Sequence, residues 1–117
     1  SVENFLRAKA HYLLRGPLKG RDAVFVWGAG LMGKRLSKHL LRLDAPLVAF
    51  VDIDPRKIGR TRRRKPIIAA EQLPDWWARY RNPVLLSAVG SRGARPLIRA
   101  RLQELGLIEG EDWWAAA

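Results

Sequence analysis

The stretch AVFVWGAGLMG, residues 23–33, decides the fold of this chain. Its apolar, strand-forming first half leads directly into the pattern Gly-x-Gly-x-x-Gly. Apolar residues at helical spacing follow at once and predict a helix that runs to about Leu43. A strand, a glycine turn and a helix in this order form the context in which the pattern binds the phosphates of a dinucleotide. The alternative is a tight strand-to-helix turn that binds no ligand.

The three glycines of this turn have different physical roles. Gly28 permits the tight turn out of the strand, Gly30 lets a phosphate approach the backbone, and Gly33 lets the helix pack close to the strand. The helix N-terminus offers unpaired N–H groups and the positive end of its dipole to an anion. We therefore predict a phosphate-binding turn made of Gly28, Ala29, Gly30, Leu31, Met32 and Gly33.

The composition indicates one domain with an affinity for anions. The chain has 117 residues, 48% of them hydrophobic, which fits a single core. Lys and Arg number 22 against 11 Asp and Glu, so the formal net charge is +11. This charge favours nucleotides, nucleic acid or an anionic membrane surface as partners. A solvated, arginine-rich surface is the alternative.

Some kinds of site and location are disfavoured by what the sequence lacks. There is no cysteine, and His11 and His39 have no metal-ligand spacing, so we predict no disulfide and no metal site. No apolar run is long enough to span a membrane and no signal peptide is visible, so we expect a cytoplasmic protein without a transmembrane segment. Because the chain starts at Ser1 without a methionine, we interpret it as a domain of a longer protein.

Five apolar runs predict a parallel sheet covered on both faces. They are residues 23–27, 47–51, 66–69, 84–89 and 113–115, the last at an edge. The expected architecture is α/β, a three-layer, Rossmann-like doubly wound sheet in which these strands follow the order 3-2-1-4-5. A short helix containing Trp76 and Trp77 precedes the fourth strand, and we expect both rings to cover a face of the sheet.

An extra helix is expected before the first strand. Val2, Phe5, Leu6, Ala10 and Leu13 recur at helical spacing, and the pattern stops at Gly16-Pro17. A minimal Rossmann unit has no such helix. We therefore divide the chain into an N-terminal linker helix, residues 1–18, and a Rossmann-like nucleotide-binding domain, residues 19–117. The helix either connects to an upstream domain or packs at the edge of the sheet.

Acidic residues follow the second predicted strand. Asp52 lies 24 positions after Gly28, where an acid typically accepts hydrogen bonds from the ribose of a bound nucleotide. It would repel a 2′-phosphate, so we expect NAD or a nucleotide with free ribose hydroxyls rather than NADP. Asp54 is the alternative acid, or a turn residue before Pro55, and the adjacent Arg56 completes this part of the predicted site. Turn chemistry alone is the competing explanation for both acids.

A strongly basic run follows these acids. Seven of the ten residues 56–65 are Lys or Arg. A loop here lies beside the expected binding crevice and would bring its charges to phosphates, or it is simply a solvated loop. Because no aromatic residue is interleaved to stack bases, we do not expect nucleic acid as a partner.

A second glycine-rich turn follows the fourth strand. In a doubly wound sheet it lies across the crevice from the first turn, so we predict that Gly90, Ser91 and Arg92 form the opposite wall. Ser91 is the expected cap of a helix with an apolar face made of Leu97, Ile98, Leu102 and Leu105. A capped helix with exposed arginines and no ligand is the alternative.

No catalytic residue is predicted. The chain has no Tyr-x-x-x-Lys after either tyrosine, no cysteine nucleophile and no serine in a Gly-x-Ser-x-Gly elbow. A complete dehydrogenase also needs a substrate domain, for which 117 residues leave no room. These observations favour a binding module without chemistry of its own.

Segments 26–33 and 49–60 resemble domains of sugar-nucleotide enzymes. They are similar to the Rossmann-like domain at the front of membrane-linked nucleotide-sugar epimerases and dehydratases. They also resemble the N-terminal domain of bacterial sugar acyltransferases, whose later turn looks like residues 88–91. The strongest likeness is to a C-terminal domain of some bacterial family 2 glycosyltransferases, in which a segment like residues 5–18 leads into the first strand. The resemblance covers residues 5–114.

The resemblance implies a nucleotide or nucleotide-sugar pocket at the two glycine turns, with catalysis in an upstream glycosyltransferase domain of the same chain. Related domains often carry a short, apolar-leaning loop where this chain has Arg60 to Lys65, so the role of this loop stays open. We therefore predict a non-catalytic accessory domain of bacterial glycoconjugate synthesis. The alternatives are an NAD-binding fragment of an oxidoreductase and a ligand-free module that docks on an anionic membrane surface through a basic face.

Overall fold

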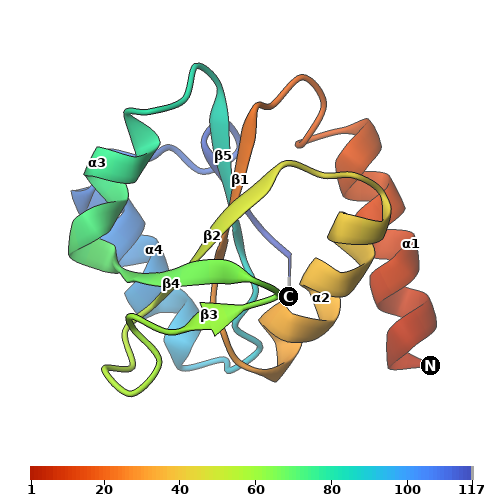
Figure 1. Ribbon diagram of the computed structural model, residues 1–117, viewed down its shortest axis with the longest axis horizontal. Coiled ribbons are helices and arrows are strands. Elements are labelled where there is room, and N and C mark those ends of the chain that lie inside the picture. The colour runs from red at the N-terminus through yellow and green to blue at the C-terminus, as the bar shows by residue number, and fades with distance from the viewer. Residues whose placement is uncertain (117) are drawn as a thin grey trace.

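A six-stranded sheet forms the centre of the molecule in the computed structural model, which describes residues 1–116 (Figure 1). The strand order is β3-β4-β2-β1-β5-β6. Within residues 1–116 the strands are β1 (Ala23–Trp27), β2 (Leu47–Asp52), β3 (Thr61–Arg62), β4 (Lys65–Ala69), β5 (Pro83–Ser87) and β6 (Trp113–Ala115). Every pairing is parallel except that of β3 with β4. The predicted α/β class and the order of the five predicted strands are confirmed, and β3 is an addition that the sequence analysis missed.

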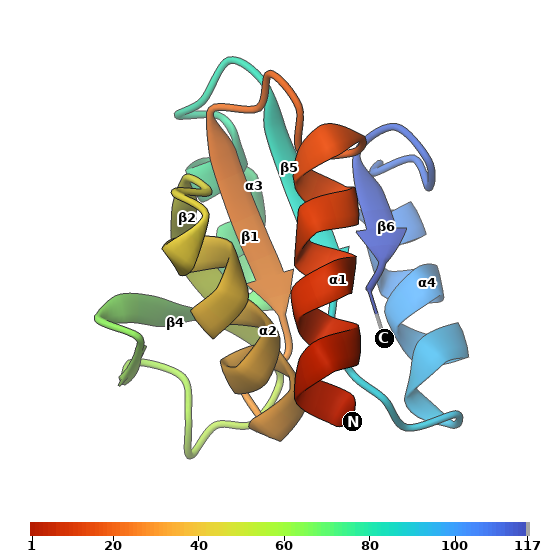
Figure 2. The same ribbon diagram turned by 90° about the vertical axis from the view of Figure 1, so that its right-hand side faces the viewer.

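Helices cover both faces of this sheet. The helices α1 (Val2–Arg15) and α2 (Leu31–Arg42) lie on one face, while the 3-10 turn η1 (Ala70–Gln72), α3 (Leu73–Trp77) and α4 (Ala94–Glu104) lie on the other (Figures 1 and 2). The residues of β1 alternate between the two cores, with Val24 and Val26 facing α1 and α2, and Phe25 and Trp27 facing α3 and α4. All five residues of β1 are buried, which explains the continuous apolar run in its sequence.

The N-terminal helix α1 is part of the domain core. Leu6, Ala10 and Leu13 are buried against α2 and the sheet, as part of the expected apolar face. Val2 and Phe5 were expected on that face as well, but the structure leaves both exposed. Figure 2 shows α1 beside α2 on the same face of the sheet. None of the helices within residues 1–116 has the length and hydropathy that a membrane span needs.

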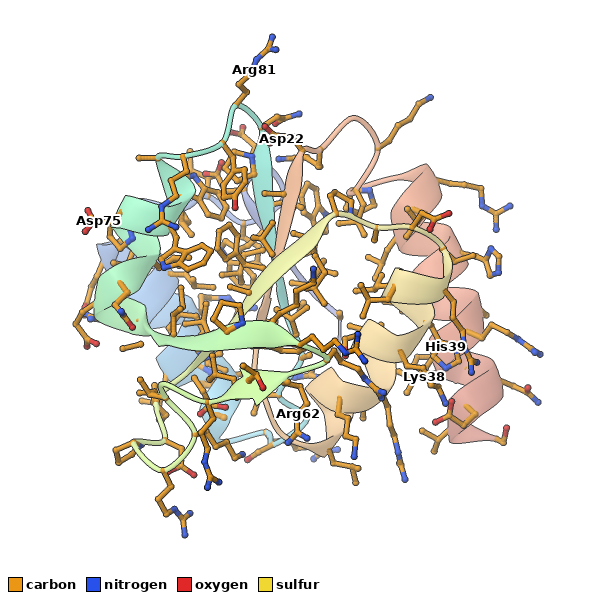
Figure 3. The ribbon with its side chains drawn as sticks, viewed as in Figure 1. Asp22, Lys38, His39, Arg62, Asp75 and Arg81 are labelled. Carbon is orange, nitrogen blue, oxygen red and sulfur yellow. The ribbon has the colours of Figure 1, made fainter. Side chains whose placement is uncertain are left out.

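Polar side chains fix the two ends of the sheet. At one end, Asp22 accepts hydrogen bonds from the backbone N–H groups of Arg81 and Asn82, at 2.8 Å each. These bonds, the one from Arg81 first, lower the pKa of the Asp22 carboxyl. Arg62 lies at the other end, near the start of α2 (Figure 3). That second end carries the glycine turns.

Trp76 and Trp77 are partly buried and pack against a face of the sheet, as expected. The ring of Trp77 stacks on Phe25 with centroids 5.6 Å apart, and Trp76 meets the same ring edge-on at 6.5 Å. Tyr80 contacts Phe25 from a third direction. These aromatic contacts attach α3 to the face of the sheet that carries Phe25.

Candidate functional site

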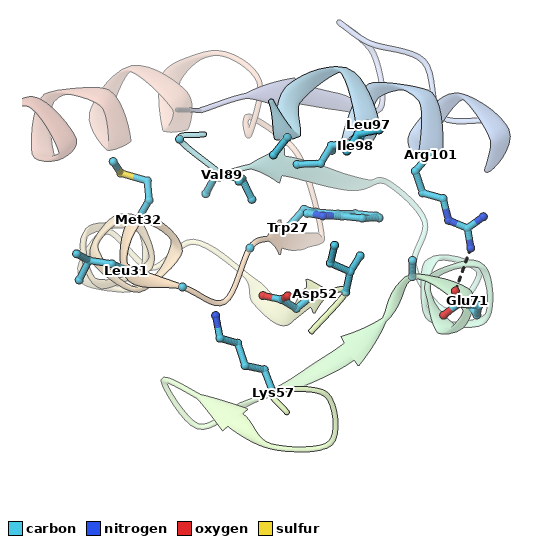
Figure 4. Close-up of a pocket in the computed structure, with 17 residues that line it drawn as sticks. Trp27, Leu31, Met32, Asp52, Lys57, Glu71, Val89, Leu97, Ile98 and Arg101 are labelled. Carbon is cyan, nitrogen blue, oxygen red and sulfur yellow. Dashed lines mark hydrogen bonds and ion pairs between the residues drawn. The ribbon is translucent and has the colours of Figure 1, made fainter. Parts of the chain in front are cut away.

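A cavity of about 480 Å³ opens at the carboxyl ends of the parallel strands. It extends from the first glycine turn, past the end of β2, to the start of α4 (Figure 4). This is the position at which open α/β sheets bind ligands, because the chain leaves the central strands in opposite directions there. The cavity has a polar part beside the first turn and an apolar part beneath α4.

The three glycines of the first turn are constrained in different ways. Gly28 has φ +112°, and a Cβ there would lie 2.9 Å from the Val89 side chain. A Cβ on Gly33 would overlap the carbonyl oxygen of Gly28. Gly30 has φ −81° and only the Nζ of Lys57, at 3.6 Å, near its Cβ position. Packing within the chain therefore requires glycine at positions 28 and 33 but not at position 30.

Two charged side chains hold the peptide groups of Ala29 between these glycines. The N–H of Ala29 donates to Asp52 Oδ2 at 2.8 Å, and its carbonyl accepts from the Arg62 guanidinium at 3.1 and 3.3 Å. The other Asp52 oxygen accepts from the N–H of Asp54 at 3.0 Å. The turn is thus fixed from β2 on one side and from β3 on the other before any ligand enters.

The basic run after β2 is a β-hairpin packed against this turn. Strands β3 and β4 are joined by Arg63 and Arg64, with φ values of 52° and 62°. Arg63 donates to the carbonyl oxygen of Lys34 in α2 at 2.9 Å. The interpretation of this run as a solvated loop is therefore wrong for Arg62 and Arg63, because both guanidinium groups bond to backbone carbonyls around the first turn.

The other residues predicted after β2 separate into two groups. Asp52 lines the cavity and is 9% exposed. Asp54 accepts hydrogen bonds from the backbone and side chain of Arg56, whose side chain is 89% exposed, and neither residue lines the cavity. The Arg56 side chain first, and its backbone N–H second, lower the pKa of the Asp54 carboxyl. Asp54 therefore organises the turn, as its competing explanation proposed.

The second glycine turn contributes little to the cavity. Gly90 lines it, together with Ala88 and Val89, whereas Ser91 and Arg92 are exposed and outside the lining. Ser91 is not the expected cap: α4 begins after Gly93 without a side-chain cap, and the N–H of Ala94 reaches the Ser91 carbonyl instead. The expected opposite wall is formed by α4 itself.

Apolar side chains line the part of the cavity beneath α4. Trp27 forms its floor, and Leu97 and Ile98 cover it from above (Figure 4). Leu97 was expected on the apolar face of this helix, but it is 72% exposed and lies at the rim of the cavity. Ile53 and Leu31 are also lining residues and are 76% and 63% exposed. Large apolar groups at a cavity rim would gain from contact with an apolar part of a ligand.

Within residues 1–116, two cations line the cavity, and neither was named among the predicted site residues, although Lys57 belongs to the basic run for which phosphate contact was one expectation. Arg101 of α4 pairs with Glu71 at 3.2 Å and with Glu104 at 3.1 Å, closing the apolar end. Lys57 reaches from the loop after β2 toward the first turn. The only sequence signal for Lys57 is its place in the basic run, where seven residues share the same charge.

The residues predicted for the first turn are divided between the cavity lining and the turn behind it. Gly28, Gly30, Leu31 and Met32 line the cavity, and Ala29 and Gly33 shape the turn from behind it.

Comparison with known proteins identifies the fold. No family model and no curated protein matches the sequence. The Rex-family repressor RSP has a similar structure, with a TM-score of 0.65 and 19% identity over 90% of this chain and 49% of RSP. RSP in complex with β-NAD⁺ and operator DNA gives a TM-score of 0.62 and 20% identity over 98% of this chain and 57% of that one.

A similar structure also occurs in an enzyme. UDP-D-quinovosamine 4-dehydrogenase from Vibrio fischeri gives a TM-score of 0.58 and 23% identity over 74% of this chain and 73% of the enzyme. The chain therefore spans about half the length of the RSP chains and has a Rossmann-like fold. At these identities the likeness concerns the fold alone.

Proposed function

We propose that this chain is a nucleotide-binding domain whose cavity takes a dinucleotide of the NAD type. The diphosphate would lie against the first glycine turn and the N-terminus of α2. Asp52 would accept hydrogen bonds from the ribose, using lone pairs that the N–H groups of Ala29 and Asp54 leave free. The adenine would enter the apolar part of the cavity between Ile53 and Leu97.

Gly30 is the observation that carries this proposal. Its backbone angles are open to any residue, and ordinary contact distance separates its Cβ position from the nearest atom. No atom of the protein would therefore clash with a Cβ at position 30. A glycine is required only if another group approaches that backbone closely, which is what a phosphate does in this motif.

Two further observations agree with a dinucleotide. RSP, which shares this fold, has been solved with β-NADH and with β-NAD⁺. The cavity volume of about 480 Å³ lies within the usual range for small-molecule sites, and its combination of apolar walls with a few polar groups is typical of them.

A nucleotide-sugar is the second candidate. The name of the similar enzyme from Vibrio fischeri contains a UDP-sugar, and segments 26–33 and 49–60 resemble nucleotide-sugar-binding domains. Both ligand classes present a diphosphate and a ribose to the same turn and the same acid. The hypothesis that this domain is an accessory domain of a glycosyltransferase is supported by the sequence resemblance. The comparisons with known proteins add no support for it.

A matched pair of glycine variants tests the proposal. Gly30 and Gly93 both precede the first residue of a helix, and Gly93 has open space around its Cβ position. We expect Gly30→Val to weaken NAD or UDP-sugar binding at least about tenfold, or about 1.4 kcal/mol, while Gly93→Val leaves it within about twofold. Isothermal titration calorimetry with NAD, NADH, NADP and UDP-sugars measures both effects.

The same titrations separate the alternatives. Preference for NAD over NADP is expected, because Asp52 would repel a 2′-phosphate. Binding of a UDP-sugar alone would select the second candidate. A docking module without a ligand would instead bind anionic vesicles in a salt-sensitive way that Gly30→Val leaves unchanged. Equal nucleotide affinity in the wild type and in Gly30→Val would contradict our assignment of the site.

A further inference from the structure

We propose that Lys57 is the cation that binds the ligand's diphosphate, so that this cavity selects nucleotides by their diphosphate as well as by their base. This inference rests on the proposed function. It adds a binding residue outside the Gly-x-Gly-x-x-Gly pattern and narrows the ligand class to ribosyl diphosphates.

The backbone of Lys57 is fixed by the compact loop after β2. The N–H groups of Lys57 and Ile58 both donate to the Asp54 carbonyl, at 2.9 and 3.1 Å. The loop then joins β4 through two backbone hydrogen bonds of 2.9 Å each, from Gly59 to Ile67 and from Ile67 to Arg60. The Lys57 side chain therefore extends from a well-anchored backbone segment.

The side chain of Lys57 points into the cavity beside the first glycine turn (Figure 4). Its Nζ lies 3.6 Å from the position that a Cβ of Gly30 would occupy. That position is the space in which the motif places a phosphate. A phosphate bound there would meet the ammonium group and the free N–H groups at the start of α2 at the same time.

The ammonium group of Lys57 is available for a ligand. Within residues 1–116, no carboxylate oxygen lies within 4.0 Å of its Nζ, whereas Arg101, the other cation of the cavity, is paired with two glutamates. Lys57 is only partly buried, so its ammonium group can be reached by a ligand in the cavity. A half-buried, unpaired cation facing the N-terminus of a helix produces a positive region that favours an anion.

The neighbouring residue provides a matched comparison. Arg56 has the same charge and lies one position earlier, but its guanidinium group is paired with Asp54 at 3.2 Å and its side chain is 89% exposed. It does not line the cavity. If general positive charge in this loop attracted the ligand, the two residues would contribute equally. If the geometry decides, only Lys57 contributes.

Calorimetric titrations on the 117-residue chain test this inference. The probes are adenosine, ADP, NAD, uridine, UDP and inorganic pyrophosphate, applied to the wild type, Lys57→Met, Lys57→Arg and Arg56→Met. Methionine keeps most of the alkyl chain, so the fold should be retained. Circular dichroism melts check this for each variant.

We expect Lys57→Met to weaken ADP, NAD or UDP, and pyrophosphate, at least about tenfold, since charge-assisted hydrogen bonds to phosphate are lost. Binding of the nucleoside without phosphate should change less than about twofold. Lys57→Arg should restore part of the loss, and Arg56→Met should stay within about twofold of the wild type for every probe.

The outcomes distinguish this inference from the proposed function. If Lys57→Met binds the diphosphates as tightly as the wild type, the role of Lys57 is refuted while the nucleotide site stands. An equal loss in Arg56→Met also refutes it, because the effect would be one of general charge. If the wild type binds pyrophosphate through Lys57 but no nucleotide, the proposed function fails and the anion site remains. No binding of any probe refutes both.

Discussion

The two glycine-rich turns of this chain resemble each other in sequence but differ in how tightly the protein constrains them. In the first, Gly28 and Gly33 have no room for a side chain, and Ala29 is held by Asp52 and Arg62. In the second, a Cβ on Gly90 or Gly93 would meet nothing within 4 Å. Ser91 and Arg92 are exposed, and within residues 1–116 neither side chain makes a hydrogen bond to the rest of the fold.

The difference reflects the positions of the turns in the sheet. The first turn leaves the central strand β1, and side chains from two other strands, Asp52 of β2 and Arg62 of β3, bond to it. The second turn leaves β5, and among the described residues, 1–116, only the short strand β6 lies beyond β5 in the sheet. A glycine pattern therefore indicates a rigid turn only where other elements surround it, and rigidity in advance of binding reduces the entropy lost on binding.

The largest contrast between the two turns is expected on substituting single glycines with alanine. Gly33→Ala would force a methyl group onto the Gly28 carbonyl, so we expect a loss of at least about 3 kcal/mol in the free energy of unfolding. Gly93→Ala has open space and should change it by less than about 0.5 kcal/mol. Urea denaturation followed by circular dichroism measures both free energies of unfolding. A denaturation midpoint equal to that of the wild type for Gly33→Ala would contradict the expected clash with the Gly28 carbonyl.

The next contrast concerns the carboxylate that holds the first turn. Asp52→Ala leaves two N–H groups without their acceptor, at least one of them buried, and should lower the free energy of unfolding by about 2–3 kcal/mol. Ser91→Ala, in the second turn, should change it by less than about 0.5 kcal/mol. The same denaturation curves compare the two variants. Similar small losses in both would mean that the first turn does not depend on Asp52.

Arginine variants test whether the basic hairpin supports the first turn. Arg62→Met removes the donors to the Ala29 carbonyl and should cost about 1–2 kcal/mol. Arg92→Met removes the same charge from the second turn and should stay within about 0.5 kcal/mol of the wild type. Amide exchange measured by NMR should accelerate at Ala29 in Arg62→Met only. Unchanged exchange in that variant would assign the hairpin no role in holding the turn.

Much of the fold could be predicted because its determinants are local. Buried parallel strands require continuous apolar runs, and glycines at fixed spacing mark the crossover from β1 to α2. The hairpin gave no such signal: Arg63 and Arg64 adopt positive φ angles, where Asn-Gly is the usual sequence. Its turn is stabilised by a contact with α2, which is remote in sequence.

The site was predictable at the first turn and less so around it. Arg56 and Lys57 are adjacent cations in one basic run, but Arg56 pairs with Asp54 outside the cavity, whereas Lys57 lines the cavity. Leu97 fits the helical periodicity of a core residue, yet it lies at a cavity rim because no element within residues 1–116 covers that part of α4. Both distinctions depend on tertiary contacts, which the charge and the helical periodicity of the sequence do not reveal.

Lowering the pH should change the environment of the loop beside the first turn before that of the second turn. This is the smallest effect that we expect. The pKa of the Asp54 carboxyl is lowered by Arg56, so its interaction is complete at neutral pH and is lost as the pH falls through that lowered value, below the ordinary 3.8. The second turn has no carboxylate among residues 90–95. NMR titration should therefore show the amides of Arg56 and Lys57 moving below about pH 4, before those of Arg92 and Gly93. Asp54→Asn keeps an acceptor for the turn but cannot titrate, so it should remove this early movement. If the movement persists in that variant, the acid sensitivity belongs to another group and the loop that holds Lys57 is independent of Asp54.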